Sequence, residues 1–404
     1  MKQRLRIPPG FAEVADRAPF NVDIHSPWPA RTFRSPSLCV SRHLDFTIMK
    51  GSGTGPLTQI ETDVLIVGAG PIGLELAIAL KRSGIRYVQL DAGQIGSTIG
   101  WYAPQTHFFS SPERIAIAGV PLQTIDQTKA TREEYLNYLR AVVLQFGLDI
   151  ETYERVTSLR KQDDGTFALT SLRDDIERRW VTRHVVLAIG DMHRPRRIDV
   201  PGEDLPHVSH YLGDPHIYFR RRVLIVGGKN SAIEAVVRCV RVGAEVTLAY
   251  RGAELDADHI KFWLYPEIRG LFRDGRVRFL PRTIVRHIDS RRVLVERLDG
   301  ERSEMLEVEA DFVLLLTGYE QDPDLFLQAG VTLVGPSRQP LVNGQTMETN
   351  VRGLFVAGTA AAGTQSSGVK EFIETSHVHV DRIVAALTGT VATDVPVHYD
   401  MPES

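Results

Sequence analysis

Residues 64–73 read VLIVGAGPIG, and this stretch decides the fold. The apolar, β-branched run at 64–67 predicts a short buried strand, and the glycine-rich loop follows it without a gap. Apolar residues then recur at helical spacing as far as Leu80. A second β-rich run at 87–90 ends in the acidic Asp91. Strand, GxGxxG loop, helix, strand and acid, in that order, predict a dinucleotide-binding βαβ unit.

Each residue type of this unit has a physical reason. Gly68 permits a tight turn, Gly70 lets the backbone approach a pyrophosphate, and Gly73 lets the helix pack closely on the strand. The helix at Pro71 offers free N–H groups and a partial positive charge to the phosphates. Asp91 lies where a carboxylate accepts hydrogen bonds from an adenosine ribose. We therefore predict that these five residues bind the first nucleotide.

The unit recurs later in the chain. Residues 223–252 align with residues 64–93 without a gap, and the identical positions include Glu75 and Glu234. Two units of this kind imply two dinucleotides, with electrons passing between them. The sequence therefore predicts an α/β fold with two Rossmann-like domains, the second inserted in the first.

The second loop differs from the first in its charges. It reads GGKNSA, and we predict that the second nucleotide is bound by Gly227, Gly228, Lys229, Asn230, Ser231 and Ala232. Asp91 aligns with Tyr250, so the second copy lacks the ribose-binding carboxylate, and Arg251 follows directly. An acid at this point would repel a 2′-phosphate, whereas an arginine can bind it in bidentate fashion. The first site is therefore predicted to hold FAD and the second NADPH.

Arg251 also has a plainer interpretation, as a solvated arginine on the surface. Many NADPH sites have a second arginine close by, and none follows Arg251 in the sequence before Arg269. Both interpretations stay open at this point.

Three further strand-like runs end in glycine, at 185–190, 312–318 and 353–358. The first two resemble the short hinges that link the two nucleotide domains in flavoproteins of this class. The third resembles a strand that brings its backbone to the ribityl and pyrophosphate of FAD, although Thr359 stands where an acid is usual. A run at 369–386 with helical spacing would follow as the closing helix. We predict cofactor contacts at the three glycines, Gly190, Gly318 and Gly358.

These elements divide the 404 residues into parts. We expect an FAD domain at 59–192 and 310–392, an NADPH domain at 193–309 and a tail at 393–404. Residues 1–58 are rich in proline and show no sustained periodicity. This N-terminal arm is disordered, docks as an extended strap, or is not made because translation begins at Met49.

Composition excludes several classes of protein. With 43% hydrophobic residues, 24% charged residues and a net charge of −3, the chain lacks the basic excess of a nucleic-acid-binding protein. No apolar run reaches the ~20 residues that a membrane helix needs. Cys39 and Cys239 are the two cysteines, which excludes a disulfide scaffold and a four-cysteine zinc site. We expect a cytoplasmic protein without a metal site.

Residues 60–390 resemble the thioredoxin-reductase-like flavoproteins and, within them, the YpdA family of bacillithiol disulfide reductases. The motifs that carry the resemblance are GAGPIG at 68–73, PGEDLP at 201–206, SHY at 209–211, GGKNSA at 227–232, AYRG at 249–252, TGY at 317–319, METNV at 347–351, AG at 357–358 and AAG at 361–363. The resemblance implies FAD, NADPH and the reduction of a low-molecular-weight disulfide as the small-molecule electron acceptor. Assembly with copies of the same chain stays open.

One position departs from that family. Its proposed catalytic cysteine stands immediately before the last glycine of the first loop, where this chain has Ile72. Cys239 aligns internally with Leu80 on a predicted helix, which favours a small buried hydrophobe. Cys39 lies in the arm. The sequence therefore names no catalytic residue.

Other polar residues give weak signals. His377 and His379 are two apart on a predicted helix, so they point to different faces and make a poor metal pair. Lys370, Glu371 and Glu374 either line a substrate pocket or form the solvated face of that helix.

Three functions remain for comparison. The first is an NADPH-dependent flavoprotein reductase in which the acceptor draws electrons directly from the flavin. The second is a flavin monooxygenase, although His207 follows the 200–202 segment without the aromatic residue that we would expect in its FxGxxxH-type motif. The third is a non-enzymatic NADPH or redox sensor. The sequence does not name the electron acceptor.

Overall fold

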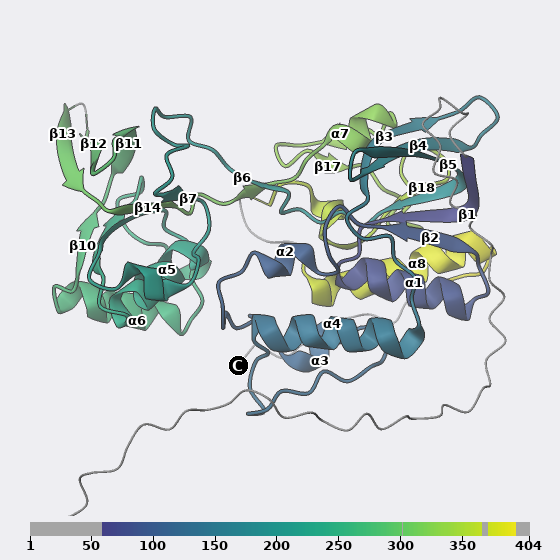
Figure 1. Cartoon of the computed structure of the whole chain (residues 1–404), viewed down its shortest axis with the longest axis horizontal. Coiled ribbons are helices and arrows are strands. Elements are labelled where there is room, and N and C mark those ends of the chain that lie inside the picture. Colours follow the sequence, from purple (N-terminus) through teal and green to yellow (C-terminus); the bar gives the residue numbers. More distant parts are fainter. Residues whose placement is uncertain (1–58, 301, 366–370, 393–404) are drawn as a thin grey trace, which may run out of the picture. The chain divides into compact units, whose positions relative to one another are not determined.

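The computed structural model describes residues 59–300, 302–365 and 371–392. The expected arm, the tail and Cys39 lie outside these residues. A first sheet has the strand order β2-β1-β5-β4-β3, and β18 also pairs with β5 (Figure 1). Its strands are β1 (Gln59–Val67), β2 (Tyr87–Leu90), β3 (Arg155–Lys161), β4 (Phe167–Arg173), β5 (Ile176–Leu187) and β18 (Leu354–Val356).

The two faces of the first sheet are buried by different elements because side chains alternate along each strand. Val64 and Ile66 pack with helices on one face. Leu65 and Val67 pack on the other face against side chains of β3 and β4, which run antiparallel to each other. The helical elements of this part are α1 (Pro71–Arg82), α2 (Ser97–Gly100), α3 (Pro112–Ile115), α4 (Arg132–Phe146), α7 (Asp324–Gln328), η3 (Gly358–Ala362) and α8 (Ile373–Thr388).

A second sheet has the order β10-β9-β8-β14-β7, with all pairs parallel. Val223 and Ile225 face α5 and α6, whereas Leu224 and Val226 face an antiparallel sheet of β11, β12 and β13. Its elements are β7 (Val208–Ser209), η1 (Pro215–Tyr218), β8 (Arg222–Val226), α5 (Asn230–Arg241), β9 (Glu245–Ala249), η2 (Ala257–His259), α6 (Leu264–Arg273), β10 (Val277–Leu280), β11 (Thr283–Ile288), β12 (Arg292–Asp299), β13 (Arg302–Glu309) and β14 (Phe312–Leu315).

The predicted α/β class with two Rossmann-like units is confirmed. The chain leaves the first sheet after β5, builds the second sheet, and returns to pair β18 with β5. The two crossing segments pair with each other, β6 (Arg194–Pro195) against β15 (Tyr319–Glu320). A small pair of β16 (Leu333–Val334) and β17 (Gln339–Pro340) follows.

The boundary expected at residue 310 needs one correction. β14 pairs with β8, so residues 312–315 belong to the second sheet, and the chain crosses back only after them. A buried strand that ends in glycine looks alike in either sheet, which is why the sequence alone placed this crossing too early. The assignment of each part to FAD or NADPH stays a prediction.

The closing helix is shorter at its start than the pattern predicts. It begins at Ile373 and ends at Thr388, where Gly389 adopts a left-handed φ of 70°. Val369 and Lys370 lie outside the described residues. In the part of the chain that the structure describes, no helix is long and apolar enough to cross a membrane.

His377 connects α8 to α1 and α3 through two hydrogen bonds. Its Nδ1 lies 2.6 Å from Glu75 Oε2 and its Nε2 lies 2.9 Å from the Arg114 carbonyl oxygen, so both ring nitrogens must donate. Burial opposes the charge, but the Glu75 carboxylate outweighs it and raises the pKa of His377.

We expect His377→Gln to lower the urea midpoint of unfolding, because a charge-assisted hydrogen bond contributes about 1.5–3 kcal/mol. Since the folded pKa is raised, this contribution is complete below the unfolded value of about 6.5 and is lost as pH rises through the folded value. The difference in urea midpoint between wild type and variant should therefore be large at pH 6 and small at pH 9. An equal gap at both pH values would contradict a charged His377.

Candidate functional site

The first glycine loop contains two glycines that the protein itself requires. A Cβ at Gly68, where φ is +114°, would lie 2.3 Å from the Ala188 carbonyl oxygen. A Cβ at Gly73 would lie 2.3 Å from the Gly68 carbonyl oxygen. Because these two glycines have no side chain, the start of α1 can lie close to the ends of β1 and β5. Gln89, which is 1% exposed, also donates from Nε2 to the Gly68 carbonyl oxygen at 2.9 Å.

Gly70 behaves differently from its neighbours. It is the N-cap residue of α1, with φ −75° and ψ −179°, a conformation that any residue adopts. A Cβ there would have no atom of the described chain within 4 Å. The protein therefore leaves open the space beside Gly70, next to the N–H groups that begin α1. A pyrophosphate is the group that the sequence predicts for this space, and its binding there stays a prediction.

Asp91 is held at the end of β2 beside the loop. It is 8% exposed, and its carboxylate accepts from Ala69 N at 2.6 Å and from Gly93 N at 2.7 Å. Burial raises the pKa of Asp91, and the two backbone hydrogen bonds oppose that shift. A carboxylate has about four acceptor positions. The Ser97 side chain also donates to Asp91, so the carboxylate can still accept about one further hydrogen bond, as from a ribose hydroxyl.

The strand ends beyond this loop meet at one edge, because β1, β5 and β18 are parallel neighbours. Gly190 and Gly358 follow β5 and β18 and both have φ +73°. Asp191 lies there too, with its Oδ2 2.9 Å from Gln365 Nε2 and a hydrogen bond from the Thr359 side chain. Burial raises the pKa of Asp191. Asp191, which follows the neighbouring strand β5, is therefore an acid beside Thr359. No sequence motif indicates that these two residues meet.

Among the described residues, no reactive thiol lies at this loop. Ile72 is 5% exposed, and a Cβ on Gly358 would lie 3.4 Å from the Ile72 Cβ. Cys239 is 0% exposed within the core of the second sheet, and burial raises the pKa of its thiol to about 12. Cys239 is thus a small buried hydrophobe, as its alignment with Leu80 suggested.

The second glycine loop is built around an aromatic ring. A Cβ at Gly228 would lie 2.3 Å from the ring of Tyr250, and a Cβ at Gly252 would lie 2.5 Å from the same ring. Gly227, with φ +147°, approaches Leu316, and its Cβ would lie 2.9 Å from the Ala232 Cβ. Tyr250 thus occupies the end of β9, where the first unit has its acid.

The remaining residues of this loop begin α5. Lys229 is its exposed N-cap residue, with φ −115° and ψ −172°, and Ser231 is exposed. Asn230 Oδ1 accepts from Lys261 N at 2.6 Å, so its side chain fixes the neighbouring segment. Lys229 and Ser231 are therefore the side chains of this loop that are exposed to a ligand.

Arg251 has an arginine neighbour that the sequence did not reveal. Arg251 is exposed, and it has no hydrogen bond or ion pair with another described residue. Arg282 N donates to the Gly252 carbonyl oxygen at 2.8 Å, because β10 lies parallel to β9. The Arg282 guanidinium lies 3.2 Å from Asp299. Strand pairing therefore brings the backbone of a second arginine beside Gly252, while the guanidinium of that arginine pairs with Asp299.

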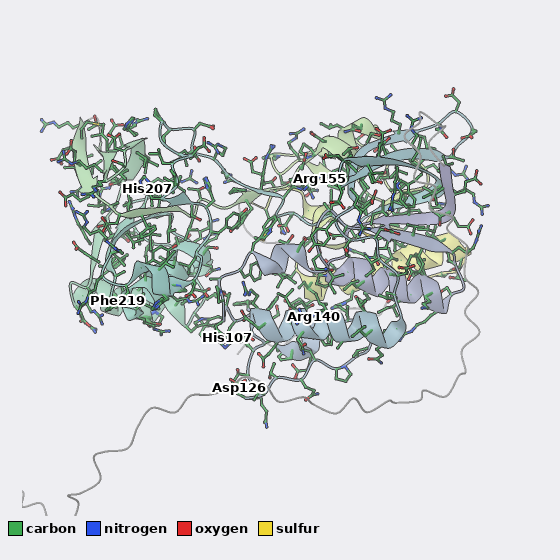
Figure 2. The ribbon with its side chains drawn as sticks, viewed as in Figure 1. His107, Asp126, Arg140, Arg155, His207 and Phe219 are labelled. Carbon is green, nitrogen blue, oxygen red and sulfur yellow. The ribbon has the colours of Figure 1, made fainter. Side chains whose placement is uncertain are left out.

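The polar residues outside the two glycine loops lie in different environments. His107 is exposed (Figure 2), whereas His379 is 4% exposed with a buried Nδ1 that has no hydrogen-bond partner among the described residues. Burial lowers the pKa of His379 to about 4. Glu371 N donates to Gln365, and burial raises the pKa of Glu371. Glu374 is 8% exposed, so the start of α8 is not a solvated face.

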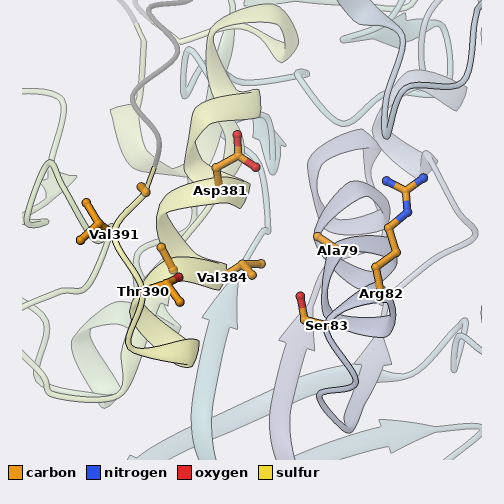
Figure 3. Close-up of a pocket in the computed structure, with 9 residues that line it drawn as sticks. Ala79, Arg82, Ser83, Asp381, Val384, Thr390 and Val391 are labelled. Atoms are coloured by element: carbon orange, nitrogen blue, oxygen red, sulfur yellow. The ribbon is translucent and has the colours of Figure 1, made fainter.

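A groove also opens beside the far end of α1 (Figure 3). Its lining includes Arg82 at the end of α1, the following residue Ser83, and Asp381 and Val384 from α8. Because α1 starts at the glycine loop and ends at this groove, the groove is separate from the predicted nucleotide site.

Comparison with known proteins identifies the family. Residues 65–358 match the pyridine nucleotide-disulphide oxidoreductase family. The chain is 35% identical to the bacilliredoxin reductase Bdr of Bacillus subtilis (strain 168), over 81% of this chain and 98% of that protein. It is 28% identical to a ferredoxin–NADP reductase of Ignicoccus hospitalis, over 73% of this chain and 89% of that protein.

Solved structures agree with this assignment. The bacillithiol disulfide reductase Bdr (YpdA) from Bacillus cereus matches with a TM-score of 0.76 and 33% identity, over 81% of this chain and 99% of that one. A thioredoxin reductase from T. acidophilum, at 18% identity and a TM-score of 0.62, shares the fold. The resemblance to the YpdA family is thereby confirmed.

Family membership carries the cofactor classes with it. Enzymes of this family and its relatives bind FAD and depend on NAD(P)H, which confirms both expected cofactor classes. The chain is accordingly a flavoprotein oxidoreductase. The chain is 35% identical to Bdr over 81% of its length, and residues 65–358 match the family. This chain therefore belongs to the pyridine nucleotide-disulphide oxidoreductase family.

Proposed function

We propose that this chain is an NADPH-dependent reductase of a small acceptor, which draws its electrons from FAD without help from a protein thiol. Bound FAD would supply the redox chemistry between the nicotinamide and the acceptor. The protein's own residues bind the two nucleotides, orient them and exclude water.

The first site is assigned to FAD because of what its residues offer. Gly70 leaves space beside the start of α1, and Asp91 stands at the end of β2 with acceptor capacity to spare. The diphosphate and the ribose of an adenine dinucleotide fit these two groups. Gly190 and Gly358 continue the same edge of the sheet, so the other half of the dinucleotide would lie along them.

The second site is assigned to NADPH because of its charge. Tyr250 replaces the carboxylate that would repel a 2′-phosphate, and Arg251 stands exposed beside it. The Arg282 backbone lies at the neighbouring strand end, but its guanidinium is paired with Asp299. The exposed Arg251, with Tyr250 in place of an acid, therefore carries the preference for the phosphorylated nucleotide.

The single observation that carries the thiol-free route is the burial of Ile72. It stands where the resembling reductases have their proposed cysteine, and it is 5% exposed against Gly358. Thiol–disulfide exchange requires a thiolate that can reach the substrate. The described thiol, Cys239, is fully buried and has a pKa of about 12. Among the described residues no thiol is placed to carry electrons to the acceptor, which supports the proposal that the acceptor takes them from FAD directly.

The acceptor is proposed to be the disulfide of a low-molecular-weight thiol. The relative with 35% identity is a bacilliredoxin reductase, and a solved structure with 33% identity is a bacillithiol disulfide reductase. Bacillithiol disulfide, cystine and a quinone should be offered to the purified enzyme with NADPH. Fast NADPH oxidation with a disulfide supports the proposal, whereas fast oxidation with the quinone alone would exclude a disulfide as the acceptor.

We expect a Cys39→Ser, Cys239→Ser double variant to keep its NADPH-dependent turnover. Cys239→Ser places a hydroxyl in the core, so a stability loss of about 1–3 kcal/mol is expected. Turnover at a temperature below unfolding and flavin reduction by NADPH under anaerobic conditions should both be measured. If a single serine variant abolished turnover but left flavin reduction normal, that cysteine would be catalytic and the thiol-free route would be wrong.

A further inference from the structure

Gln89 is a buried polar residue beneath the first glycine loop. It is 1% exposed, and its Nε2 donates to the Gly68 carbonyl oxygen at 2.9 Å. Its Oε1 is also buried and has no hydrogen-bond partner among the described residues. An unpaired buried acceptor costs at least as much free energy as one neutral hydrogen bond gains. The amide of Gln89 therefore contributes little net stability to the fold.

Gln89 acts together with Asp91 on one peptide group. The peptide between Gly68 and Ala69 has its C=O bonded to Gln89 Nε2 and its N–H bonded to the Asp91 carboxylate at 2.6 Å. A trans peptide points these two groups in opposite directions, and side chains two apart along an extended chain lie on the same face. Gln89 on β2 and Asp91 just after it therefore hold this peptide from both ends. We call these two hydrogen bonds the peptide clamp.

The clamp lies directly under the first turn of α1. A Cβ at Gly73 would lie 3.2 Å from Gln89 Nε2, so the glycine makes room for the amide. The next carbonyl oxygen, that of Ala69, accepts from Gly96 N at 3.0 Å. The protein's own groups thereby fix the direction of the chain where it enters Gly70 and the start of α1.

The second nucleotide unit is built differently at the same place. Gln89 aligns with Leu248, which is equally buried but has no donor, and Asp91 aligns with Tyr250. The Tyr250 ring packs against Gly228 instead. A leucine at the corresponding position of the second unit indicates that the Rossmann-like fold does not require the glutamine.

We propose that Gln89 is a positioning residue, which fixes the Gly68–Ala69 peptide and so slows the release of the dinucleotide from the first site. This inference rests on the proposed function, which places FAD there. A loop already held in its binding conformation loses less conformational entropy when the ligand binds, and the gain in affinity is found mainly in slower dissociation. A flavin has to stay bound through many turnovers, whereas NADPH has to exchange in each one. The first unit has the clamp and the second has leucine, in agreement with that difference.

The test is the rate of FAD release from the full-length holoenzyme after dilution, followed by the rise in flavin fluorescence. Gln89→Leu gives the first unit the side chain that the second unit carries. It should release FAD roughly three- to tenfold faster than wild type, the change expected for the loss of one neutral hydrogen bond. The dissociation constant for NADPH should stay unchanged, because Gln89 contacts the first loop.

A second measurement separates positioning from a structural role. The urea midpoint of the flavin-depleted full chain should be equal in Gln89→Leu and wild type, or higher in the variant, because the substitution removes a buried acceptor without a partner. Gln94→Leu is the matched control, since Gln94 is exposed and accepts from Ile95 N outside the clamp. It should release FAD like wild type.

Gln89→Glu tests whether the donated hydrogen bond is the cause. At pH 5 a buried carboxyl is protonated, so it can donate to the Gly68 carbonyl oxygen as the amide does. FAD release from Gln89→Glu at pH 5 should therefore be close to that of wild type at the same pH. Release as fast as that from Gln89→Leu would contradict the role of the donor.

The outcomes separate this inference from the proposed function. If Gln89→Leu releases FAD at the wild-type rate, or if Gln94→Leu speeds release as much, the inference is overturned while the FAD site stands. If Gln89→Leu lowers the urea midpoint of the flavin-depleted chain and weakens both nucleotides, Gln89 is a structural residue and the inference is again overturned. If purified wild type contains no FAD, the proposed function itself fails and the inference falls with it.

Discussion

Gly70→Val should yield a folded protein that purifies without its yellow cofactor. A Cβ at residue 70 would meet no atom of the described chain within 4 Å, and the φ of −75° suits valine. The fold should therefore survive, with a cost of up to about 1 kcal/mol at the helix N-terminus. The same side chain would fill the space that the pyrophosphate needs. Flavin content, measured by absorbance after purification, should fall to near zero.

Two glycine variants define what this result means. Gly344→Val is the matched control, because Gly344 is equally open, has no left-handed φ, and lies outside both glycine loops. It should fold and keep its flavin. Gly73→Val would press against the Gly68 carbonyl oxygen at 2.3 Å and should fail to fold. A Gly70→Val protein that retained full flavin content would remove the principal support for an FAD site at this loop.

The parts that the sequence predicted well are those in which one local pattern has one physical meaning. The continuous apolar runs at 64–67 and 223–226 require strands with two covered faces, and both sheets have them. The glycines at 68 and 227 both approach a neighbouring carbonyl oxygen, so each is required by the turn. The duplication of these patterns was enough to predict two Rossmann-like units.

The parts that it missed depend on which strands become neighbours. Asp191 stands beside Thr359 because β18 returns to pair with β5, after the whole second sheet has been built. Arg282 stands beside Gly252 because β10 pairs with β9. No spacing within the sequence encodes either meeting.

Gly228 shows a limit of a different kind. The motif assigns this glycine to phosphate binding, but the structure gives it a packing reason as well, since the Tyr250 ring lies where its Cβ would be. A glycine motif therefore predicts that space is needed without saying what fills it. At Gly70 the space is open, whereas at Gly228 a side chain of the protein occupies it.

Arg251→Ala should weaken NADPH binding roughly ten- to a hundredfold and leave NADH binding nearly unchanged. The factor follows from one charge-assisted hydrogen bond, about 1.5–3 kcal/mol, to a phosphate that NADH lacks. Arg251 is exposed without a partner among the described residues, so the substitution should not disturb the fold. Dissociation constants for both nucleotides, or KM values from anaerobic flavin reduction, provide the measurement.

Arg282 and Arg278 make this prediction specific. Arg282→Gln should weaken NADPH less than Arg251→Ala does, because the Arg282 guanidinium already pairs with Asp299 at 3.2 Å. Arg278 is an exposed arginine of β10, so Arg278→Ala removes the same charge from the same sheet and should change neither nucleotide's affinity. If Arg251→Ala and Arg278→Ala weakened NADPH equally, the effect would be one of overall charge. If Arg251→Ala weakened NADH as much as NADPH, Arg251 would contact a part that both nucleotides share, and the choice of NADPH would have to come from Lys229 or Arg282.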